Sequence, residues 1–261
     1  MTAADAYLAS ESGADDAAFQ ALADLAIILE DQDDAGVIGG HMVGILTALH
    51  PSPGFVLRRT GDADGGIPKL VATSGTVHER LTGAGYVATS GNRYEKPGGE
   101  GQEPRIVDLL IPNLNRRLGE EKVGGRHFDT MPALGMALAG GRRVTVSATL
   151  SAGEELTFTV RVPSVEGAII LKSYAWADRR ATKDVVDLHS LFRIVDTHPA
   201  DAIGGWRLSE DPPKGARLDT ARTLHTLADR WEARPPQMTF DTRLLTTAIR
   251  THVAYPEAGS V

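Results

Sequence analysis

The chain has 261 residues, a formal net charge of −7 and the composition of an ordinary globular protein. No apolar run approaches the roughly 18–20 residues of a membrane span, and no basic region followed by an apolar stretch indicates a secretory signal. The sequence contains no cysteine, which excludes disulfides, thiolate-bound zinc and thiol catalysis. Because such a chain fits a reducing compartment, we expect a cytoplasmic protein that does not associate with a membrane.

The charges are unevenly distributed. Residues 1–34 contain nine acidic residues and no lysine or arginine, so the remainder has 25 acidic and 27 basic residues and a net charge of +2. Pairs of adjacent arginines occur in that remainder, at positions 58–59, 116–117, 142–143 and 179–180. These pairs permit a polyanionic substrate but do not require one, since a mixed solvated surface also contains them.

The first predicted elements alternate between helix and strand. Residues 1–14 are small and polar, and we expect them to be mobile. A helix is predicted from residue 15 to 29, with Asp16 as its N-cap, because apolar residues recur at helical spacing. Residues 36–40 then predict a short buried strand that ends in a glycine turn, and residues 41–50 predict a helix that ends before Pro51.

The middle of the chain predicts further strands. Residues 54–64 form a predicted strand with two aspartates at its C-terminal end, and residues 73–86 a predicted helix that ends in glycines. Residues 92–96 and 105–113 are predicted strands joined by a glycine-rich loop. Residues 141–150 and 155–163 predict a hairpin.

The last third of the sequence is predicted to be helical. Helices are expected at residues 164–180, 181–196, 216–230 and 240–252. We therefore predict an α/β (α+β) fold in which a mixed β-sheet is flanked by helices and followed by a mostly α-helical domain. The expected domain boundaries are 1–14 for a flexible N-terminus, 15–162 for the α/β domain and 163–261 for the helical domain.

Three acidic residues and a glycine turn predict a metal and phosphate site. Asp62 and Asp64 face the same side of a strand, and two carboxylates at that spacing raise each other's pKa unless a cation lies between them. A solvated turn is the alternative, because aspartate and glycine both favour turns. Asp108 interrupts an apolar run, where a charge is costly unless it is paired or binds metal. Together with a helix that begins at Gly39 and Gly40, these acids favour Mg²⁺ and the phosphates of a substrate.

This pattern resembles the nucleotidyltransferase superfamily of DNA polymerase β. In that superfamily a hydrophobic residue and two small residues precede Asp-x-Asp, and a third acid lies on a later strand. The matching residues are Ile38, Gly39, Gly40, Asp62, Asp64 and Asp108. The resemblance implies that Asp62, Asp64 and Asp108 bind Mg²⁺, that the NTP is aligned by the first two, and that Asp108 helps to deprotonate an acceptor hydroxyl. The two glycines are then expected to hold the phosphates.

Over roughly residues 36–193 the chain resembles AbiEii/MenT-type nucleotidyltransferase toxins. These toxins contain Arg-x-Thr-x-Asp-x-Asp, which Arg58 and Thr60 begin here. They also have a lysine on one helix, followed by arginine and Asp-x-x-Asp on the next, which Lys172, Asp184 and Asp187 match. The chain departs from the superfamily pattern in two ways: 21 residues separate the glycine pair from the first acid, and two glycines follow the second acid where an apolar residue is usual.

The late motif and two basic residues have competing interpretations. Lys172 lies in an apolar stretch, where a buried ammonium needs an anion such as a triphosphate, although a lysine can also extend along its helix to water. Asp184 and Asp187 each follow a basic residue, Arg180 or Lys183, by four positions, which is the spacing of surface ion pairs. The resemblance instead implies that the two acids orient Lys172 or an arginine from the interior. Arg58 is a candidate for neutralising phosphate. His41 is a candidate for touching phosphate, with capping or packing as the alternative.

The resemblance implies a Mg²⁺-dependent enzyme that transfers a nucleoside monophosphate from an NTP to an acceptor hydroxyl. For the toxin family it further implies a tRNA 3′ end as acceptor, a block of translation and a cognate antitoxin as partner. One alternative is a nucleotidyltransferase that modifies a small molecule such as an antibiotic. Another is a catalytically inactive binding protein with the same fold.

Overall fold

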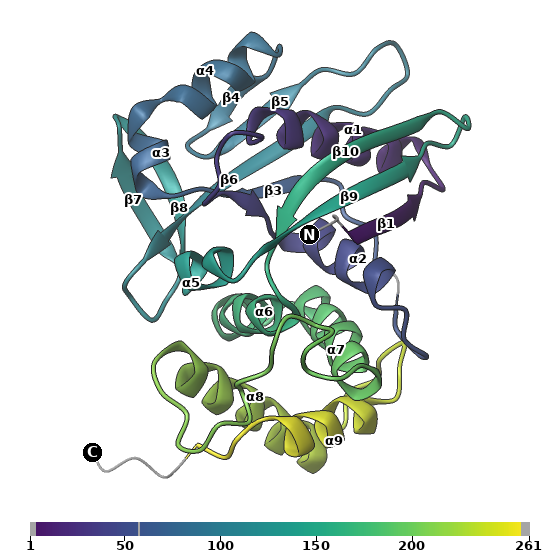
Figure 1. The fold of residues 1–261 in the computed structure, drawn as a ribbon, viewed down its shortest axis with the longest axis vertical. Helices are drawn as coiled ribbons and strands as arrows, with labels where there is room; N and C mark the ends of the chain where they lie inside the picture. The colour runs from purple at the N-terminus through teal and green to yellow at the C-terminus, as the bar shows by residue number, and fades with distance from the viewer. Residues whose placement is uncertain (1–3, 57, 257–261) are drawn as a thin grey trace.

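The computed structural model describes residues 4–56 and 58–256, which form two β-sheets and a layer of helices (Figure 1). The strands are β1 (Ala4–Ala9), β2 (Gly36–Val37), β3 (Ala63–Gly66), β4 (Val87–Ser90), β5 (Arg93–Lys96), β6 (Arg105–Asn113), β7 (Gly119–Val123), β8 (Arg126–Pro132), β9 (Arg142–Thr149) and β10 (Glu155–Val162). The helices are α1 (Gly13–Ile28), α2 (Gly39–Leu49), α3 (Lys69–Ser74), α4 (Thr76–Gly83), α5 (Leu134–Ala139), α6 (Val165–Arg179), α7 (Thr182–Thr197), α8 (Ala216–Ala233) and α9 (Thr242–His252).

The larger sheet is mixed and has the strand order β2-β3-β6-β5-β4, with β8 paired to β6 and β7 paired to β8. The central strand is β6, which runs parallel to β3 and β8 and antiparallel to β5. Its Val107, Leu109 and Ile111 are almost completely buried, which explains the apolar run in the sequence. A buried central strand fixes the register of its neighbours, because a slip of one residue would turn every side chain to the other face.

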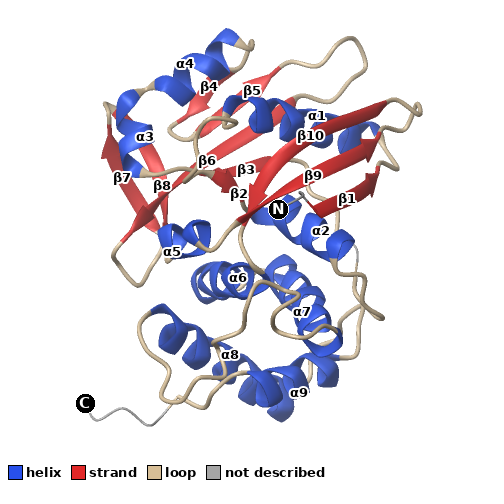
Figure 2. Ribbon diagram, viewed as in Figure 1, coloured by secondary structure: helices blue, strands red, loops and turns tan. Residues whose placement is uncertain are grey.

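The smaller sheet has the order β1-β9-β10, and α1 packs against β10 as well as against β3 and β6 of the larger sheet (Figure 2). Ser12, rather than the expected Asp16, is the N-cap of α1, and its side chain accepts a hydrogen bond from the amide of Asp15. Residues 4–9 were expected to be mobile, but they pair in parallel with β9 and bury Ala6. Positions 1–3 of the expected mobile segment lie outside the described residues.

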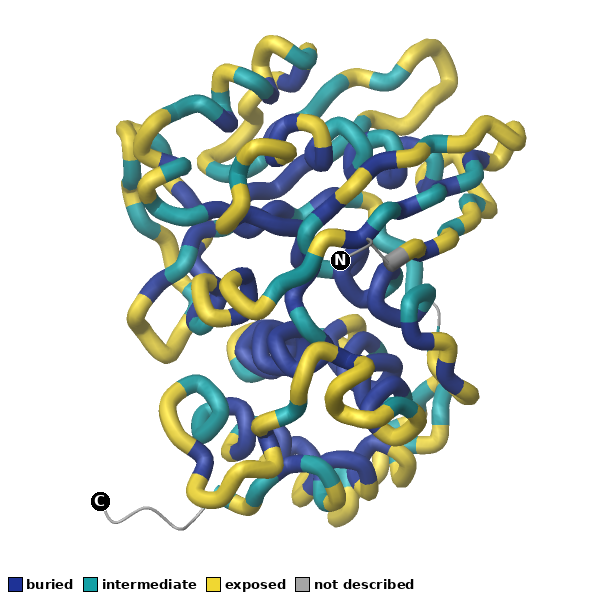
Figure 3. The backbone as a smooth tube through the Cα atoms, viewed as in Figure 1, coloured by how far each residue is buried: buried dark blue, intermediate teal, exposed yellow. Residues whose placement is uncertain are grey.

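Helices alone follow β10 in the described part of the chain. Helix α6 is buried along most of its length (Figure 3) because it packs against α5, α7 and α8 and also against β8 of the large sheet. Helix α2 packs on α7 as well as on β1 and β3, so it connects the sheets to the helical layer. The predicted fold class is confirmed, since a mixed sheet flanked by helices precedes a mostly helical region. None of the helices in the described ranges is long and apolar enough to span a bilayer.

Several predicted elements differ from the observed ones. Residues 54–56 and 58–62 lie outside the strands. The backbone of Val56 bonds to α7 instead of to a sheet, because the Ser190 hydroxyl accepts from its amide and donates to its carbonyl. The acids consequently lie at the N-terminal end of β3 and not at the C-terminal end of a longer strand. The predicted helix at 73–86 is two helices, interrupted where Gly75 adopts a φ of 76°. The predicted hairpin and the strands β5 and β6 are confirmed.

Candidate active site

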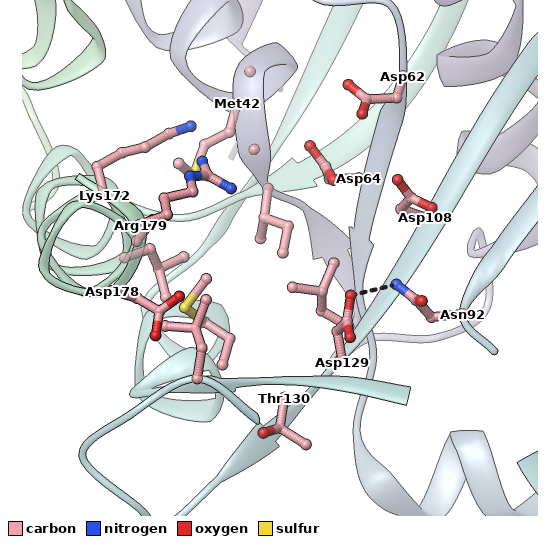
Figure 4. A pocket seen from close by; sticks show the side chains of 18 of the residues that line it. Met42, Asp62, Asp64, Asn92, Asp108, Asp129, Thr130, Lys172, Asp178 and Arg179 are labelled. Atoms are coloured by element: carbon pink, nitrogen blue, oxygen red, sulfur yellow. Dashed lines mark hydrogen bonds between the residues drawn. The ribbon is translucent and has the colours of Figure 1, made fainter. Parts of the chain in front are cut away.

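A pocket of about 510 Å³ lies between the large sheet and the helical layer (Figure 4). Strands β3, β5, β6, β7 and β8 contribute one wall, and helix α6 with the start of α7 contributes the other. The N-terminus of α2 and the segment that precedes β3 also line the pocket. The pocket therefore contains residues from distant parts of the sequence, as expected for a binding site between layers.

The three predicted acids converge in this pocket. The parallel register of β3 and β6 places Asp64 directly beside Asp108, and Asp62 precedes β3 by one residue and faces the same side. One carboxylate oxygen from each residue lies within 4.8 Å of the others. Carboxylate oxygens at such separations can share one hard cation such as Mg²⁺.

The Asp64 carboxylate is the least compensated of the three. Burial, followed by the negative charges of Asp62 and Asp108, raises the pKa of Asp64 to about 7, and Lys172 only partly opposes this effect. No ion pair within 4.0 Å reaches Asp64 from the residues that the structure describes, whereas Asp62 accepts a hydrogen bond from the Thr60 hydroxyl at 2.8 Å. A cation between the three acids would remove this electrostatic cost.

Two glycines allow the chain to pass close to the acids. Gly39 begins α2 with a φ of 66°, and a Cβ atom there would lie 1.7 Å from Oδ2 of Asp64. A Cβ on Gly40 would lie 2.7 Å from Nη2 of Arg58 and from Cβ of Thr60. Both positions therefore require glycine. The free N–H groups of the first turn of α2 lie at the edge of the pocket.

Arg93 forms the shortest contacts to the acids. Its Nε donates to Oδ1 of Asp108 at 2.9 Å and its Nη2 donates to Oδ2 of Asp108 at 2.6 Å. The same Nη2 lies 3.8 Å from Oδ2 of Asp62. The sequence analysis did not identify Arg93, because the contact follows from the register of β5 and β6, in which Arg93 and Asp108 are direct cross-strand partners.

The helical wall contributes basic side chains that are held by buried acids. Lys172 Nζ lies 2.7 Å from Oδ2 of Asp187, and the guanidinium of Arg58 binds both oxygens of the same carboxylate at 2.8 and 3.0 Å. Arg179 binds both oxygens of Asp184 at 2.7 and 2.6 Å. Asp184 and Asp187 are almost completely buried behind the pocket, so they position the cations and do not line the pocket themselves.

One candidate residue lies elsewhere. The side chain of His41 points to the opposite side of α2, where its ring packs near Phe19 at a centroid distance of 5.8 Å and lines a separate, smaller pocket. Burial lowers the pKa of His41 to about 4, so the ring is neutral near pH 7. The packing alternative describes His41 better than a phosphate contact does.

The pocket also contains residues that the sequence analysis did not select as site residues. Arg179, Lys183, Asn92, Asp129 and Glu120 line the pocket together with the predicted residues. Asn92 donates to Asp129 at 3.1 Å (Figure 4). Of these residues, Arg179 and Lys183 lie within the stretch of the late motif, between Lys172 and Asp187; the others depend on which strands are neighbours.

Comparisons with known proteins add little to this site. No family model and no curated protein matches the chain. A solved structure with a similar arrangement is an antigenic nucleotidyltransferase-like protein from Paracoccidioides brasiliensis, with 14% sequence identity and a TM-score of 0.49, covering 95% of this chain and 96% of that chain. Since the likeness is this weak, the function has to be inferred from the geometry of the pocket.

Proposed function

We propose that the protein is a metal-dependent nucleotidyltransferase that transfers a nucleoside monophosphate from an NTP to an acceptor hydroxyl and releases pyrophosphate. The observation that carries this proposal is the convergence of Asp62, Asp64 and Asp108 beside the glycine start of α2, opposite a basic wall. Phosphoryl transfer requires mainly positioning and charge neutralisation from a protein, and this pocket contains groups for both.

The residues of the pocket fit a bound Mg²⁺. Their donors are carboxylate oxygens, which Mg²⁺ prefers, and the unpaired, half-buried Asp64 gains most from a cation. When bound, the metal supplies a Lewis acid that neutralises charge on the phosphate oxygens. The backbone N–H groups at Gly39 and Gly40, with Lys172, Arg179 and Lys183 across the pocket, then bind the triphosphate.

Asp108 is the group that we assign to the acceptor. A hydroxyl oxygen bonds to the α-phosphorus, the bond from that phosphorus to the β-bridging oxygen breaks, and the hydroxyl proton passes to a carboxylate oxygen of Asp108. Pyrophosphate leaves from the side of the basic wall. Arg93 has to release Asp108 before that oxygen can take the proton, because it occupies both oxygens.

For the acceptor we propose the 3′ end of a tRNA, which would make the protein a toxin with a cognate antitoxin. The support is the resemblance of Arg58, Thr60, Lys172, Asp184 and Asp187 to the toxin motifs. Arg116 and Arg117 are exposed in the loop before β7, next to the pocket-lining Leu118, where they can meet an RNA backbone. The proposal is that these two arginines contribute to RNA affinity.

A small hydroxyl-bearing amine is the alternative acceptor. Asp129 and Glu120 line the pocket beyond Asp108, and neither forms an ion pair within 4.0 Å to a described residue. Burial, Glu120 and Asp108 raise the pKa of Asp129, so an ammonium group there would relieve the repulsion.

The test is incubation of the purified protein with each α-labelled NTP and Mg²⁺, together with either total tRNA or a panel of aminoglycosides. Transfer of label to one acceptor class by the unmodified protein, and its loss in Asp64→Asn, would support the proposal and identify the acceptor class. If no acceptor becomes labelled while Asp64→Asn and the unmodified protein bind metal and NTP equally, the nucleotidyltransferase proposal is wrong.

For the RNA arm, Arg116→Gln/Arg117→Gln should weaken tRNA binding and reduce its salt dependence by about two phosphate contacts. Arg222→Gln, an exposed position on α8, is the matched control. Equal affinity for tRNA in the double variant and the control would contradict a role for the two arginines.

A further inference from the structure

We infer that Arg93 is the resident cation of the acidic triad and that a divalent metal displaces it from Asp108, so that Arg93 lowers the metal affinity of the site. This inference uses the metal site of the proposed function. It concerns a residue that none of the sequence motifs includes. On this inference a metal binds by replacing the guanidinium of Arg93 at Asp108, and not by entering an acidic site that is free of other cations.

The contacts of Arg93 compete with a metal for the same atoms. Both oxygens of Asp108 accept hydrogen bonds from Arg93, and the guanidinium also lies 3.8 Å from Asp62. A Mg²⁺ ion requires oxygens at about 2.0–2.1 Å in near-octahedral geometry, which draws the triad oxygens together. A divalent ion at that point would lie close to the guanidinium charge, so the two cations repel each other.

Arg93 is the one basic residue, within the described ranges, whose ion pairs are with the triad. Arg58 and Lys172 are paired with Asp187, and Arg179 is paired with Asp184, so a metal at the triad does not compete for their carboxylates. These three cations remain in place when a metal enters. Arg93 alone must exchange its partner.

The surroundings allow this side chain to move. Its backbone is fixed by pairing with Asp108 on β6, but the Arg93 side chain is 40% exposed, compared with 6% for Lys172. An alternative anion is near, because the positive charge of Arg93 acts on the carboxyl of Asp129 in the same pocket. A released guanidinium therefore stays in the pocket, beside Asn92 and Asp129, where it can meet an anionic group of a substrate.

The experiment measures binding of Mn²⁺ alone to the full-length protein, by electron paramagnetic resonance, without nucleotide. Because charge-assisted bonds to Asp108 no longer have to be broken, Arg93→Gln should bind Mn²⁺ about tenfold more tightly than the unmodified protein. Arg93→Lys, which keeps the charge but loses the two parallel bonds, should fall between them.

Lys183→Gln is the control for charge alone. Lys183 lines the same pocket and acts on Asp64 electrostatically, but it forms no ion pair within 4.0 Å to a described residue. Its removal should increase Mn²⁺ affinity by no more than about twofold, since the charge is screened by solvent. If Arg93→Gln changes the affinity no more than Lys183→Gln does, cation exchange is wrong and Arg93 acts only through its charge.

A second measurement does not depend on Mn²⁺. Without metal, Arg93→Gln should melt at a lower temperature than the unmodified protein, because Asp108 loses its partner, and saturating Mg²⁺ should restore most of that difference. A difference in melting temperature that Mg²⁺ leaves unchanged would show a purely structural ion pair and overturn the inference.

The outcomes separate the inference from the proposed function. Nucleotide transfer together with a metal affinity that is insensitive to Arg93 would remove the inference alone. An affinity that follows Arg93, without transfer to any acceptor, would leave the exchange intact and remove the proposed function. Failure of the unmodified protein and of Arg93→Gln to bind either metal would overturn both.

Discussion

The two walls of the pocket differ in how their charged side chains are paired. On the helical wall each paired cation has a buried acid behind it: Asp187 holds Lys172, together with Arg58 from the segment before β3, and Asp184 holds Arg179. On the sheet wall one arginine, Arg93, pairs with Asp108 and more loosely with Asp62, and Asp64 has no paired cation among the described residues. The ion pairs of the helical wall are complete without a ligand, whereas Asp64 on the sheet wall lacks a partner among the described residues.

This difference indicates that the ion pairs of the helical wall are structural and that the acids of the sheet wall bind a ligand. A buried ion pair costs free energy to desolvate, and removing one partner leaves an uncompensated charge, so the helical wall is sensitive to loss of its acids. An unpaired carboxylate beside two others destabilises the folded chain until a cation binds. Removal of the Asp64 charge on the sheet wall should therefore lower activity but not stability. Removal of Asp187 behind the helical wall should lower stability.

The largest effect is expected for Asp64→Asn. Loss of one metal ligand should reduce nucleotide transfer by roughly 1,000-fold, by analogy with the loss of a transition-state contact. Because the change also removes an uncompensated charge, the metal-free variant should melt at the same or a higher temperature than the unmodified protein. Transfer rates and melting curves check both statements, and a variant that loses activity by unfolding would contradict the comparison.

On the helical wall Asp187→Ala should destabilise the protein by about 3–5 kcal/mol, because the buried Lys172 and the half-buried Arg58 lose their shared anion. Urea unfolding measures this change. Asp178→Ala is the matched control, since Asp178 is exposed on the same wall and should cost less than about 0.5 kcal/mol. Similar losses for the two variants would mean that the buried pairs are not special.

At the boundary of the two walls, Gly39→Ala should cost about 2 kcal/mol, because the φ is positive and the new Cβ would overlap the Asp64 carboxylate. Gly44→Ala, in the interior of the same helix with no atom within 4 Å of its Cβ, should instead stabilise the chain by about 0.5–1 kcal/mol. Thermal unfolding of the pair checks the sign. A stabilising Gly39→Ala would show that the close approach is not required.

The smallest effect concerns His41, which lies on neither wall. Its folded pKa of about 4 is below its ordinary value of 6.5, so the unfolded chain takes up the proton first and stability falls as the pH drops from 6.5 towards 4. Between about pH 8 and pH 5.5 the expected loss is about 1 kcal/mol.

This loss should disappear in His41→Phe and be unchanged in His127→Phe, an exposed histidine on β8. Urea unfolding at the two pH values measures it. An identical pH dependence in both variants would assign the effect to other groups and leave His41 without a role in it.

The sequence could predict the acids and the glycine turn because each leaves a local pattern. Asp62 and Asp64 share a face through strand alternation, and the apolar run around Asp108 indicates a central strand. The shared face of Asp62 and Asp64 was predicted although the described residues between 54 and 62 lie outside the predicted strand, since alternation needs only the residues from Asp62 onward. The helical C-terminal third was predictable for the same reason, from its 3.6-residue periodicity.

Arg93, Asn92 and Asp129 could not be found in this way. Their place beside Asp108 depends on which strands are neighbours and in which register. The sequence of a single strand does not determine its partner strand, so no local pattern could identify these residues. The interior position of Asp184 and Asp187 was implied by the family resemblance alone, because their i, i+4 spacing from Arg180 and Lys183 is also that of exposed ion pairs.

By itself the sequence determined the fold class, the helical third of the chain and the identity of the three acids, because periodicity and burial act over a few neighbouring residues. Only the tertiary structure decided which charge meets which: that Arg93 occupies Asp108, that Asp187 joins Arg58 to Lys172, and that His41 faces away from the pocket. The physical reason is that the energy of a charge depends on every group within a few ångströms, and those groups come from segments that only folding brings together.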